Sequence, residues 1–456
     1  MATSTPEETT FLDWFRAAGG TVHPSVVLKA DCEGMGRGAV AGADIEPDTL
    51  LFSIPRSILL TTATASLQAQ LPDDAWSSLE GWTPLILSMM REYLRTSTWA
   101  PYFALLPTRF DALMHWSAEE LAELEGSNVL SKVGRDEADH EFEETVKPFV
   151  KAHEEVFGNP EEYTAELFHR MGSWVLSRSF HVDSKEEEEK DEDSDHEEEE
   201  EEREDVADVA MVPFADILNA KSGSDNARLF YEPTTLNMMS TSRIPAGAQI
   251  FNTYADPPNS DLLRRYGHVD EVNDADLVEV GLETVVDLVG VAAGLSEEER
   301  EARAEWLLEM GIDDTFSIET NHKLPDELVC AIKTFLLDSA DYAKAQKKES
   351  PPKPKLDAIS ADWARKIIDQ RLSEYPTSVE TDEALLQNPA LPPRKRMAVI
   401  VRLGEKRILR SARARIDADF PEGAAPAAEG LKKEKKRSRE EGAGKAAGGK
   451  KAKVRQ

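Results

Sequence analysis

The sequence predicts an α+β fold, in which a region of short strands carries a helical insert and is followed by an all-α domain. Apolar residues alternate or form short runs in the opening residues and again after residue 206, which is typical of strands. They recur at helical spacing from residue 82 to 180 and from residue 271 onward. At 456 residues the chain is long enough for two or three domains with tails.

The first 60 residues change from a helical pattern to a strand pattern. Residues 11–18 form a short amphipathic stretch, and residues 38–45 and 49–54 then alternate or run apolar. The turn-prone sequence Glu46-Pro47-Asp48 separates the last two segments. We therefore expect a short helix followed by two strands joined by a turn.

A helical insert and an acidic run separate the two predicted β regions. Residues 82–180 are predicted to be mainly helical, because residues such as Phe168, Met171 and Val175 recur at helical spacing. Residues 184–205 contain sixteen acidic and three basic residues and almost no apolar side chain. Such a segment buries too little apolar surface to offset its chain entropy, so we expect a disordered acidic insertion.

The strand pattern returns after the acidic run. Residues 236–240 and 249–254 are predicted strands, and Ile244-Pro-Ala-Gly247 is the predicted turn between them. The two β regions therefore flank the insert in the sequence.

The rest of the chain has helical spacing up to a polar tail. From residue 271, Ser296 with Glu299 suggests a capping box, and Pro325 opens a stretch with one apolar face. The Ala, Gly, Pro and Lys-rich sequence from residue 421 is predicted to be unfolded.

Composition excludes several classes of protein. With only Cys32 and Cys330, the chain lacks the residues for a disulfide framework or a four-cysteine zinc site. The N-terminal residues lack the pattern of a signal peptide, and the sequence contains no apolar run of membrane-spanning length, so we expect a soluble intracellular protein. A net charge of −34 disfavours nucleic acid as a direct substrate and favours basic protein partners.

The common catalytic signatures are missing. The sequence has no His-Glu-x-x-His, no Cys-x-x-Cys, no Gly-x-Ser-x-Gly and no phosphate-binding P-loop. We therefore predict no metal site and neither hydrolase nor kinase chemistry.

The glycine-rich sequence Glu33-Gly-Met-Gly-Arg-Gly38 has two interpretations. A dinucleotide-binding loop would need a helix after the glycines, whereas Ala39-Val-Ala41 continues into a strand pattern. The loop is then either a simple turn or a place where the backbone approaches a ligand closely.

The most informative motifs lie between residues 211 and 268. They are Met211-Val-Pro-Phe-Ala-Asp-Ile-Leu-Asn-Ala220, Asn226-Ala-Arg228, Phe251-Asn-Thr-Tyr254 and Asn259-Ser-Asp-Leu-Leu-Arg-Arg-Tyr-Gly-His268. This stretch resembles the C-terminal half of a SET domain, of the subgroup that includes the Rubisco large-subunit methyltransferase and the ribosomal-protein lysine methyltransferases. The segments 33–56, 101–117 and 173–180 resemble the N-terminal half and the helical insert of the same family, in the same order.

The resemblance implies a fold, a domain organisation and a reaction. It implies a SET-type β fold with a threaded C-terminal segment, over residues 20–270, with a helical insert at about 82–180 and the acidic insertion at 184–205. An α-helical substrate-binding domain over residues 271–420 and a basic tail over 421–456 would follow. The implied reaction is transfer of a methyl group from S-adenosyl-L-methionine to a lysine of a basic nonhistone protein, with ribosomal proteins as the leading class.

The resemblance also implies which residues form the site. Tyr254 corresponds to the catalytic tyrosine, whose hydroxyl would orient the amine. The implied cofactor-binding residues are Glu33, Gly34, Met35, Arg178, Asn219, Ala220, Tyr254, Tyr266 and His268. The implied substrate-binding residues are Trp116, Ser177, Phe180, Asp216 and Tyr266. The sequence departs from the family at Ala220, where a histidine is common, and at His268, where another aromatic ring is common.

Two alternatives stay open at the level of sequence. The same subgroup contains histidine methyltransferases, and a SET-like body without activity would act as an acidic escort for basic ribosomal or nuclear proteins. The acidic insertion is either a passive solvated loop or an aid to encounter with a basic target. The basic clusters at 432–437 and 450–453 resemble a two-part nuclear localisation signal, which predicts a protein of the nucleus and leaves the cytoplasm open as a second location; a tail that contacts RNA or acidic surfaces is the alternative.

Overall fold

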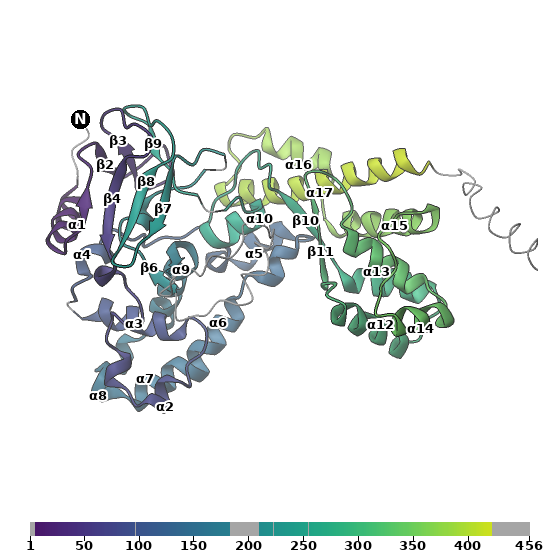
Figure 1. The fold of residues 1–456 in the computed structure, drawn as a ribbon, viewed down its shortest axis with the longest axis horizontal. Coiled ribbons are helices and arrows are strands. Elements are labelled where there is room, and N and C mark those ends of the chain that lie inside the picture. The colour runs from purple at the N-terminus through teal and green to yellow at the C-terminus, as the bar shows by residue number, and fades with distance from the viewer. Residues whose placement is uncertain (1–4, 96, 183–208, 222, 254, 422–456) are drawn as a thin grey trace, which may run out of the picture. The chain divides into compact units, whose positions relative to one another are not determined.

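The computed structural model describes residues 5–95, 97–182, 209–221, 223–253 and 255–421. The predicted acidic insertion at 184–205, Tyr254 and all but the first residue of the predicted basic tail lie outside these residues. The chain divides into two compact units (Figure 1). The first contains Met1–Leu124, Asn128–Asp276 and Asn388–Val401, and the second contains Glu125–Ser127, Leu277–Gln387 and Arg402–Gln456.

The sheets of the first unit combine strands from both sides of the insert. The pairing of β4 with β8 and of β3 with β9 joins segments about 180 to 210 residues apart into one β fold. The four-stranded antiparallel sheet has the order β1 (Thr21–Val22), β4 (Leu50–Pro55), β8 (Thr235–Ser240) and β7 (Ala227–Tyr231). A three-stranded sheet contains β2 (Val26–Lys29), β3 (Gly38–Ala41) and β9 (Gln249–Ile250), and β5 (Ser179–His181) pairs with β6 (Val209–Met211).

The predicted strands are confirmed in position, although two are shorter than expected. β3 ends at Ala41 and β9 at Ile250. The opening helix is also confirmed as α1 (Pro6–Ala17), which begins earlier than predicted because Thr5 and Glu8 form a capping box.

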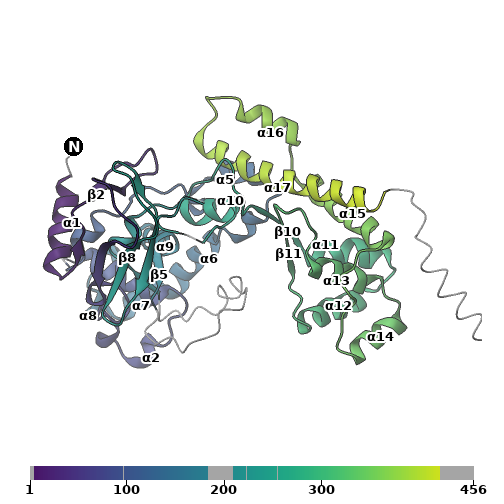
Figure 2. The same ribbon diagram turned by 45° about the horizontal axis from the view of Figure 1, so that its top comes forward.

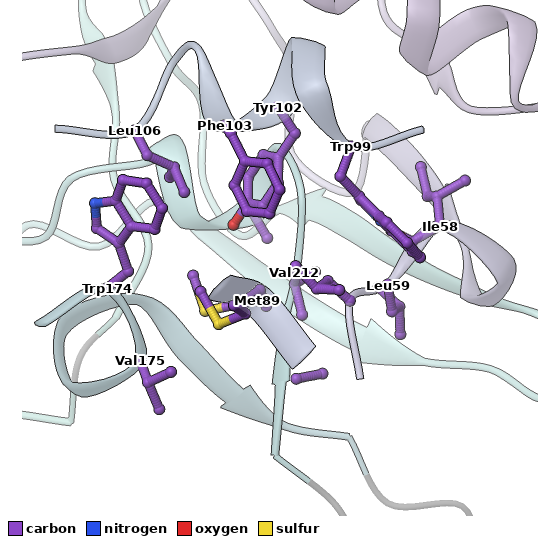
Figure 3. Packing of buried hydrophobic residues seen from close by; sticks show 14 of the residues in the cluster. Ile58, Leu59, Met89, Trp99, Tyr102, Phe103, Leu106, Trp174, Val175 and Val212 are labelled. Carbon is purple, nitrogen blue, oxygen red and sulfur yellow. The ribbon is translucent and has the colours of Figure 1, made fainter. Parts of the chain in front are cut away.

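The insert between the β regions is helical, as its spacing predicted. Its α-helices are α2 (Asp73–Trp76), α3 (Thr83–Leu94), α4 (Ala100–Phe103), α5 (Ala118–Leu121), α6 (Arg135–Glu141), α7 (Lys147–Ala152), α8 (Glu154–Phe157) and α9 (Ala165–Arg178). The aromatic residues of α4 pack with Trp174 of α9 and Met89 of α3 in one continuous core, and Figure 3 shows Tyr102 and Phe103 side by side between Trp99 and Trp174. Because α9 runs directly into β5, this core fixes the position of Arg178.

The second unit is mostly helical and contains one pair of strands. Its elements are β10 (Leu277–Gly281), α11 (Leu282–Val285), α12 (Glu297–Glu309), β11 (Thr315–Glu319), α13 (Asp326–Leu336), α14 (Ser339–Lys347), α15 (Ala358–Glu374), α16 (Val379–Leu386) and most of α17 (Pro393–Asp419). Figure 2 shows α12 to α15 gathered beside β10 and β11. The capping box of Ser296 and Glu299 and the helix after Pro325 are confirmed. The prediction of helices alone was wrong in one respect, because it missed the antiparallel pair β10–β11.

No described helix is both long and apolar enough to span a membrane.

Candidate active site

A strained turn after β6 positions the residues at the centre of the site. Phe214 has φ of +85°, which bulky residues rarely adopt. Its ring packs against Phe11, Phe15 and Phe52, with a centroid distance of 4.2 Å to Phe52, and this cluster holds the turn in place. The short 3-10 helix Ala215–Ile217 follows at once, so the turn determines where Asp216 lies.

Asp216 is buried between two elements of the insert. The Tyr102 hydroxyl donates to its Oδ2 at 2.5 Å, and the guanidinium of Arg178 donates to its backbone carbonyl. Burial raises the pKa of Asp216 to about 6, against the opposing effects of the Arg178 charge and the Tyr102 hydrogen bond. The carboxyl group is therefore mostly ionised at neutral pH but sensitive to its surroundings.

Two buried polar atoms of these two residues have no hydrogen-bond partner among the described residues. They are Oδ1 of Asp216, an acceptor, and Nε of Arg178, a donor, and both are buried. Buried polar groups in folded proteins nearly always form a hydrogen bond, so such orphaned atoms need an explanation. A cationic group would satisfy the acceptor, and an anionic group would satisfy the donor.

The glycine-rich loop is a tight turn that leads into β3. Glu33, Gly34 and Gly36 have φ values of +58°, +87° and +76°. The backbone N–H groups of Gly34 and Gly36 donate to Oδ1 of Asp31 at 3.2 and 3.3 Å, which closes the loop. The residues Glu33, Gly34 and Met35 are exposed, so the loop is open to a ligand.

Gly38 brings the loop close to Asn219. A Cβ at Gly38 would lie 2.8 Å from Nδ2 of Asn219 and 2.8 Å from Oε1 of Gln249, so a larger residue would displace these two side chains. The Asn219 amide donates to Gln249 Oε1 at 2.7 Å, and Nε2 of Gln249 donates to the Met35 sulfur at 3.7 Å. Gln249 thus connects two predicted cofactor-binding residues. Sequence reasoning identified it only as the start of a strand.

The segment that follows β9 lies alongside Asn219. The backbone N–H of Asn252 donates to the Asn219 carbonyl at 3.0 Å, and Asn219 forms a parallel bridge with Phe251. A pocket with about 360 Å³ of space, part of it open to solvent, lies beside this pairing. Its lining includes Ala220, Lys221, Asp225, Asn252, Thr253, Ala255, Asp256, Pro257, Leu262, His268 and Asp270.

Both departures from the family pattern, Ala220 and His268, therefore line one pocket. Burial lowers the pKa of His268 below its ordinary value, although the Asp270 charge opposes this. The imidazole is neutral at physiological pH and presents a flat ring. The ring of Tyr266 lies 6.0 Å from it, centroid to centroid, and burial raises the Tyr266 pKa, which keeps its phenol neutral.

The remaining predicted substrate residues have different surroundings. Ser177 is partly buried and donates to the Ser173 carbonyl at 2.6 Å, and Phe180 is a partly buried residue of β5. Trp116 is 1% exposed in a small separate cluster, and its indole N–H donates to the Asp111 carbonyl at 2.7 Å. Trp116 therefore supports the packing of the insert and offers no open face to a substrate. The predicted catalytic residue, Tyr254, lies outside the described residues.

Among the described residues, no group of histidine, cysteine, aspartate and glutamate side chains has the arrangement of a metal site. The polar groups of the site are instead two charged side chains, an asparagine and backbone N–H groups.

Family models match the two parts of the chain separately. The SET domain matches residues 36–255, and the Rubisco LSMT substrate-binding domain matches residues 295–409. The N-lysine methyltransferase SETD6 of Bos taurus is 31% identical over 88% of this chain and 93% of its own length. The ribosomal lysine N-methyltransferase 4 of Saccharomyces cerevisiae is 33% identical over 61% of this chain and 58% of its own length.

Solved structures show the same fold. A structure of Rubisco LSMT bound to sinefungin and monomethyllysine has a TM-score of 0.68 and 22% identity, over 91% of this chain and 92% of that one. A structure of Rubisco LSMT bound to AdoMet has a TM-score of 0.67 and 23% identity, over 91% and 92%. With strands from both halves joined around the insert and a relative matched over nearly its full length, the chain belongs to the SET-domain protein N-lysine methyltransferases with a Rubisco LSMT-type substrate-binding domain.

Proposed function

We propose that this protein transfers a methyl group from S-adenosyl-L-methionine to a lysine of a basic ribosomal protein. Membership of the N-lysine methyltransferase family supports the reaction. The name of the yeast relative, a ribosomal lysine N-methyltransferase, supports the class of target. The observation that carries the proposal is the pair of orphaned buried atoms, Asp216 Oδ1 and Arg178 Nε, near the predicted cofactor residues.

The residues of the site suit the parts of this cofactor. S-adenosyl-L-methionine carries the methyl group on a sulfonium, together with a carboxylate, an ammonium and an adenine. Arg178 Nε is a buried donor for the carboxylate, since guanidinium groups form strong bonds to carboxylates. The backbone of the loop at Glu33 and Gly34 would hold the amino-acid end, and Asn219 would contact the cofactor by its side chain.

The pocket beside Asn219 suits the adenine. Ala220 would contact it through its backbone, so the missing histidine side chain leaves room in the pocket. His268 would stack on the adenine with a neutral ring, because burial holds its pKa below the ordinary value. Tyr266 would separate this region from the lysine channel.

The substrate lysine needs to lose a proton before it can react. A free lysine has a pKa of about 10.4, and burial beside a sulfonium favours the neutral amine. The ionised Asp216 would accept a hydrogen bond from the entering ammonium, and the Tyr254 hydroxyl would orient the lone pair of the neutral amine. The ammonium first releases a proton to solvent. The neutral nitrogen then forms a bond to the methyl carbon as the C–S bond breaks, and S-adenosylhomocysteine is the leaving group. Positioning alone supplies on the order of 7 to 11 kcal/mol to such a step.

Labelled S-adenosyl-L-methionine tests the proposal directly. The pure protein, incubated with ribosomal and nuclear extracts, is expected to label a ribosomal protein, and Tyr254→Phe is expected to lose most of the label. Mass spectrometry of the product identifies the modified residue. Label on a histidine would show that the protein is a histidine methyltransferase. The absence of label, with Tyr254→Phe indistinguishable from wild type, would refute the proposed function.

Binding to the cofactor separates the enzyme from an acidic escort. Calorimetry with S-adenosylhomocysteine is expected to show binding to the pure protein. Binding of basic proteins without any binding of this nucleoside would favour the escort instead.

The acidic segment at 184–205 supports a basic target by its charge. Long-range attraction raises association rates and falls with salt, because salt screens the charges. Deleting residues 184–205 is expected to weaken the salt dependence of kcat/KM. Unchanged kinetics across ionic strength would make the segment a passive loop.

We also propose a nuclear location, supported only by the basic clusters of the C-terminal sequence. Truncation after Gly430 is expected to abolish nuclear fluorescence of a tagged protein. An unchanged distribution would favour a tail that contacts RNA or acidic surfaces.

A further inference from the structure

Tyr102 has an unusual partner for a tyrosine in an apolar core. It lies on α4 of the insert, is fully buried, and is surrounded by Phe103, Trp99 and Met89 (Figure 3). A buried phenol needs a hydrogen-bond partner. Tyr102 finds one 114 residues along the sequence, where Oδ2 of Asp216 accepts from its hydroxyl at 2.5 Å.

This hydrogen bond makes the two oxygens of the Asp216 carboxylate different. Oδ2 is fixed by Tyr102, and Oδ1 has no partner among the described residues. A bond to one oxygen also stops the carboxylate from rotating. Oδ1 is therefore held in one direction, buried and without a hydrogen-bond partner among the described residues.

We propose that Tyr102 is a positioning residue for methyl transfer, which orients the Asp216 carboxylate so that Oδ1 receives the lysine of the substrate. The proposal rests on the proposed function, because it assigns Oδ1 to the target amine. The helical insert thereby takes part in the reaction through one hydroxyl group.

The charges around Asp216 give Tyr102 a second effect. The groups that face the carboxyl are the Tyr102 hydroxyl from α4, the Arg178 guanidinium from α9 and the backbone N–H groups of Phe214 and Asp216. Burial favours the neutral form of the carboxyl, and these groups favour the ionised form. A neutral Asp216 would be a poorer acceptor for an ammonium. Without the phenol, the carboxyl would be protonated over a wider range of pH.

Tyr163 offers a matched comparison within the same insert. It is also buried, but its hydroxyl donates to a neutral acceptor, the Phe157 carbonyl, at 3.2 Å. Replacing either tyrosine by phenylalanine keeps the ring and removes one buried hydrogen bond. Only the bond of Tyr102 touches a carboxylate with a free oxygen.

The test measures kcat/KM of Tyr102→Phe and Tyr163→Phe across pH. The substrate is the basic protein that the wild-type enzyme labels. Tyr102→Phe is expected to lower kcat/KM for that substrate about tenfold, to leave the KM for S-adenosyl-L-methionine unchanged, and to move the acidic limb of the pH profile upward by about one unit. Tyr163→Phe is expected to keep the wild-type profile. The Tm of both variants is expected to fall by a similar amount.

A double mutant completes the test. If Tyr102 acts through Asp216, adding Tyr102→Phe to Asp216→Asn produces no further loss of kcat/KM. Additive losses, or a wild-type pH profile for Tyr102→Phe, would overturn the assignment while the methyltransferase activity stands. A wild-type protein that transfers no methyl group would overturn both.

Discussion

The two units each bury an aspartate, and the two aspartates differ in how completely their charge is satisfied. In the second unit, Asp382 accepts two hydrogen bonds from Arg402, at 3.0 and 2.8 Å, and one from Lys406 at 2.5 Å. Thr377 adds a fourth at 3.1 Å. In the first unit, Asp216 accepts one side-chain hydrogen bond, from Tyr102, and its other oxygen has no partner among the described residues.

The pKa values differ in the same sense. Burial raises the pKa of Asp382, but the hydrogen bonds from Arg402 and Lys406 outweigh burial and leave the pKa below its ordinary value. At Asp216 burial wins, and the pKa is raised to about 6. A carboxylate whose bonds are complete stabilises its surroundings. One whose bonds are incomplete has capacity left for a ligand, which is typical of functional sites.

The largest expected effect is on stability in the second unit. Asp382→Asn leaves Arg402 and Lys406 buried without their counter-charge, and breaking a buried pair in this way lowers the free energy of unfolding by about 3–5 kcal/mol. Thermal unfolding would show the loss, and calorimetry below the new Tm is expected to show unchanged affinity for S-adenosylhomocysteine. The control is Glu380→Gln, since Glu380 pairs with Arg410 on the surface of the same two helices and is expected to keep its Tm.

The second effect is on activity in the first unit. Asp216→Asn is expected to lower kcat/KM about 100-fold, or about 2.7 kcal/mol, because it removes one preorganised group from the site. Its Tm is expected to be unchanged or higher above pH 6. A Tm loss as large as that of Asp382→Asn would erase the difference between the two aspartates.

The pH dependence of stability tests the same residue. The folded-state pKa of Asp216, about 6, lies above the ordinary value of 3.8, so the folded protein holds the proton more tightly. Its contribution to stability is therefore present below about pH 4 and is lost as the pH rises to about 6. Asp216→Asn is expected to flatten the fall of Tm over this window. A parallel curve would contradict the raised pKa.

A smaller effect is expected at Gln249. Its side chain is the hydrogen-bond partner of the Asn219 amide, as Arg402 is the hydrogen-bond partner of Asp382. Gln249→Met removes the acceptor of the Asn219 amide and the donor to Met35. We expect the Kd for S-adenosylhomocysteine to rise about tenfold, or about 1.4 kcal/mol, with the KM for the protein substrate unchanged. Gln70→Met is the control, because Gln70 also makes two hydrogen bonds: it donates to the Ser66 carbonyl and accepts from Arg91. Equal losses in both variants would point to general destabilisation.

The smallest effect is expected at Glu8, a buried carboxylate with both oxygens paired. It accepts from the Thr5 backbone and from Arg37, which belongs to the glycine-rich loop. An ion pair that is open to water on one side contributes about 0.2–1 kcal/mol, so Glu8→Gln is expected to raise the Kd for S-adenosylhomocysteine by a factor of about 1.4 to 5. The charge-swapped pair Glu8→Arg with Arg37→Glu should restore part of the affinity. A Kd equal to wild type in Glu8→Gln would show that the pair between Glu8 of α1 and Arg37 of the loop does not affect cofactor binding.

Sequence reasoning located the local features of the site and missed the long-range ones. The strands, the capping boxes and the glycine-rich loop depend on neighbouring residues, so spacing and turn chemistry reveal them. The bonds from Tyr102 to Asp216 and from Asn219 to Gln249 join residues 114 and 30 positions apart. Tyr102 and Gln249 show no distinctive pattern in their own segments of the sequence. Only the folded chain brings each of them next to its partner.

Trp116 and the β10–β11 pair are further cases in which contacts between distant segments could not be predicted from the sequence. A tryptophan in a family motif reads as a contact for the substrate, but its burial depends on Leu263 and Val401, which pack against it from distant segments. The strands β10 and β11 are short, 5 residues each, and are separated by two helical segments, so their pairing leaves little pattern in the sequence.

The most direct test of the account measures methyl transfer and Tm side by side for Asp216→Asn and Asp382→Asn. Release of S-adenosylhomocysteine, with the labelled ribosomal protein as substrate, reports on the reaction, and thermal unfolding reports on the fold. We predict that Asp216→Asn loses transfer and keeps its Tm, and that Asp382→Asn loses Tm and keeps transfer at temperatures where it is folded. Full transfer by Asp216→Asn would contradict the assignment of this carboxylate to the active site.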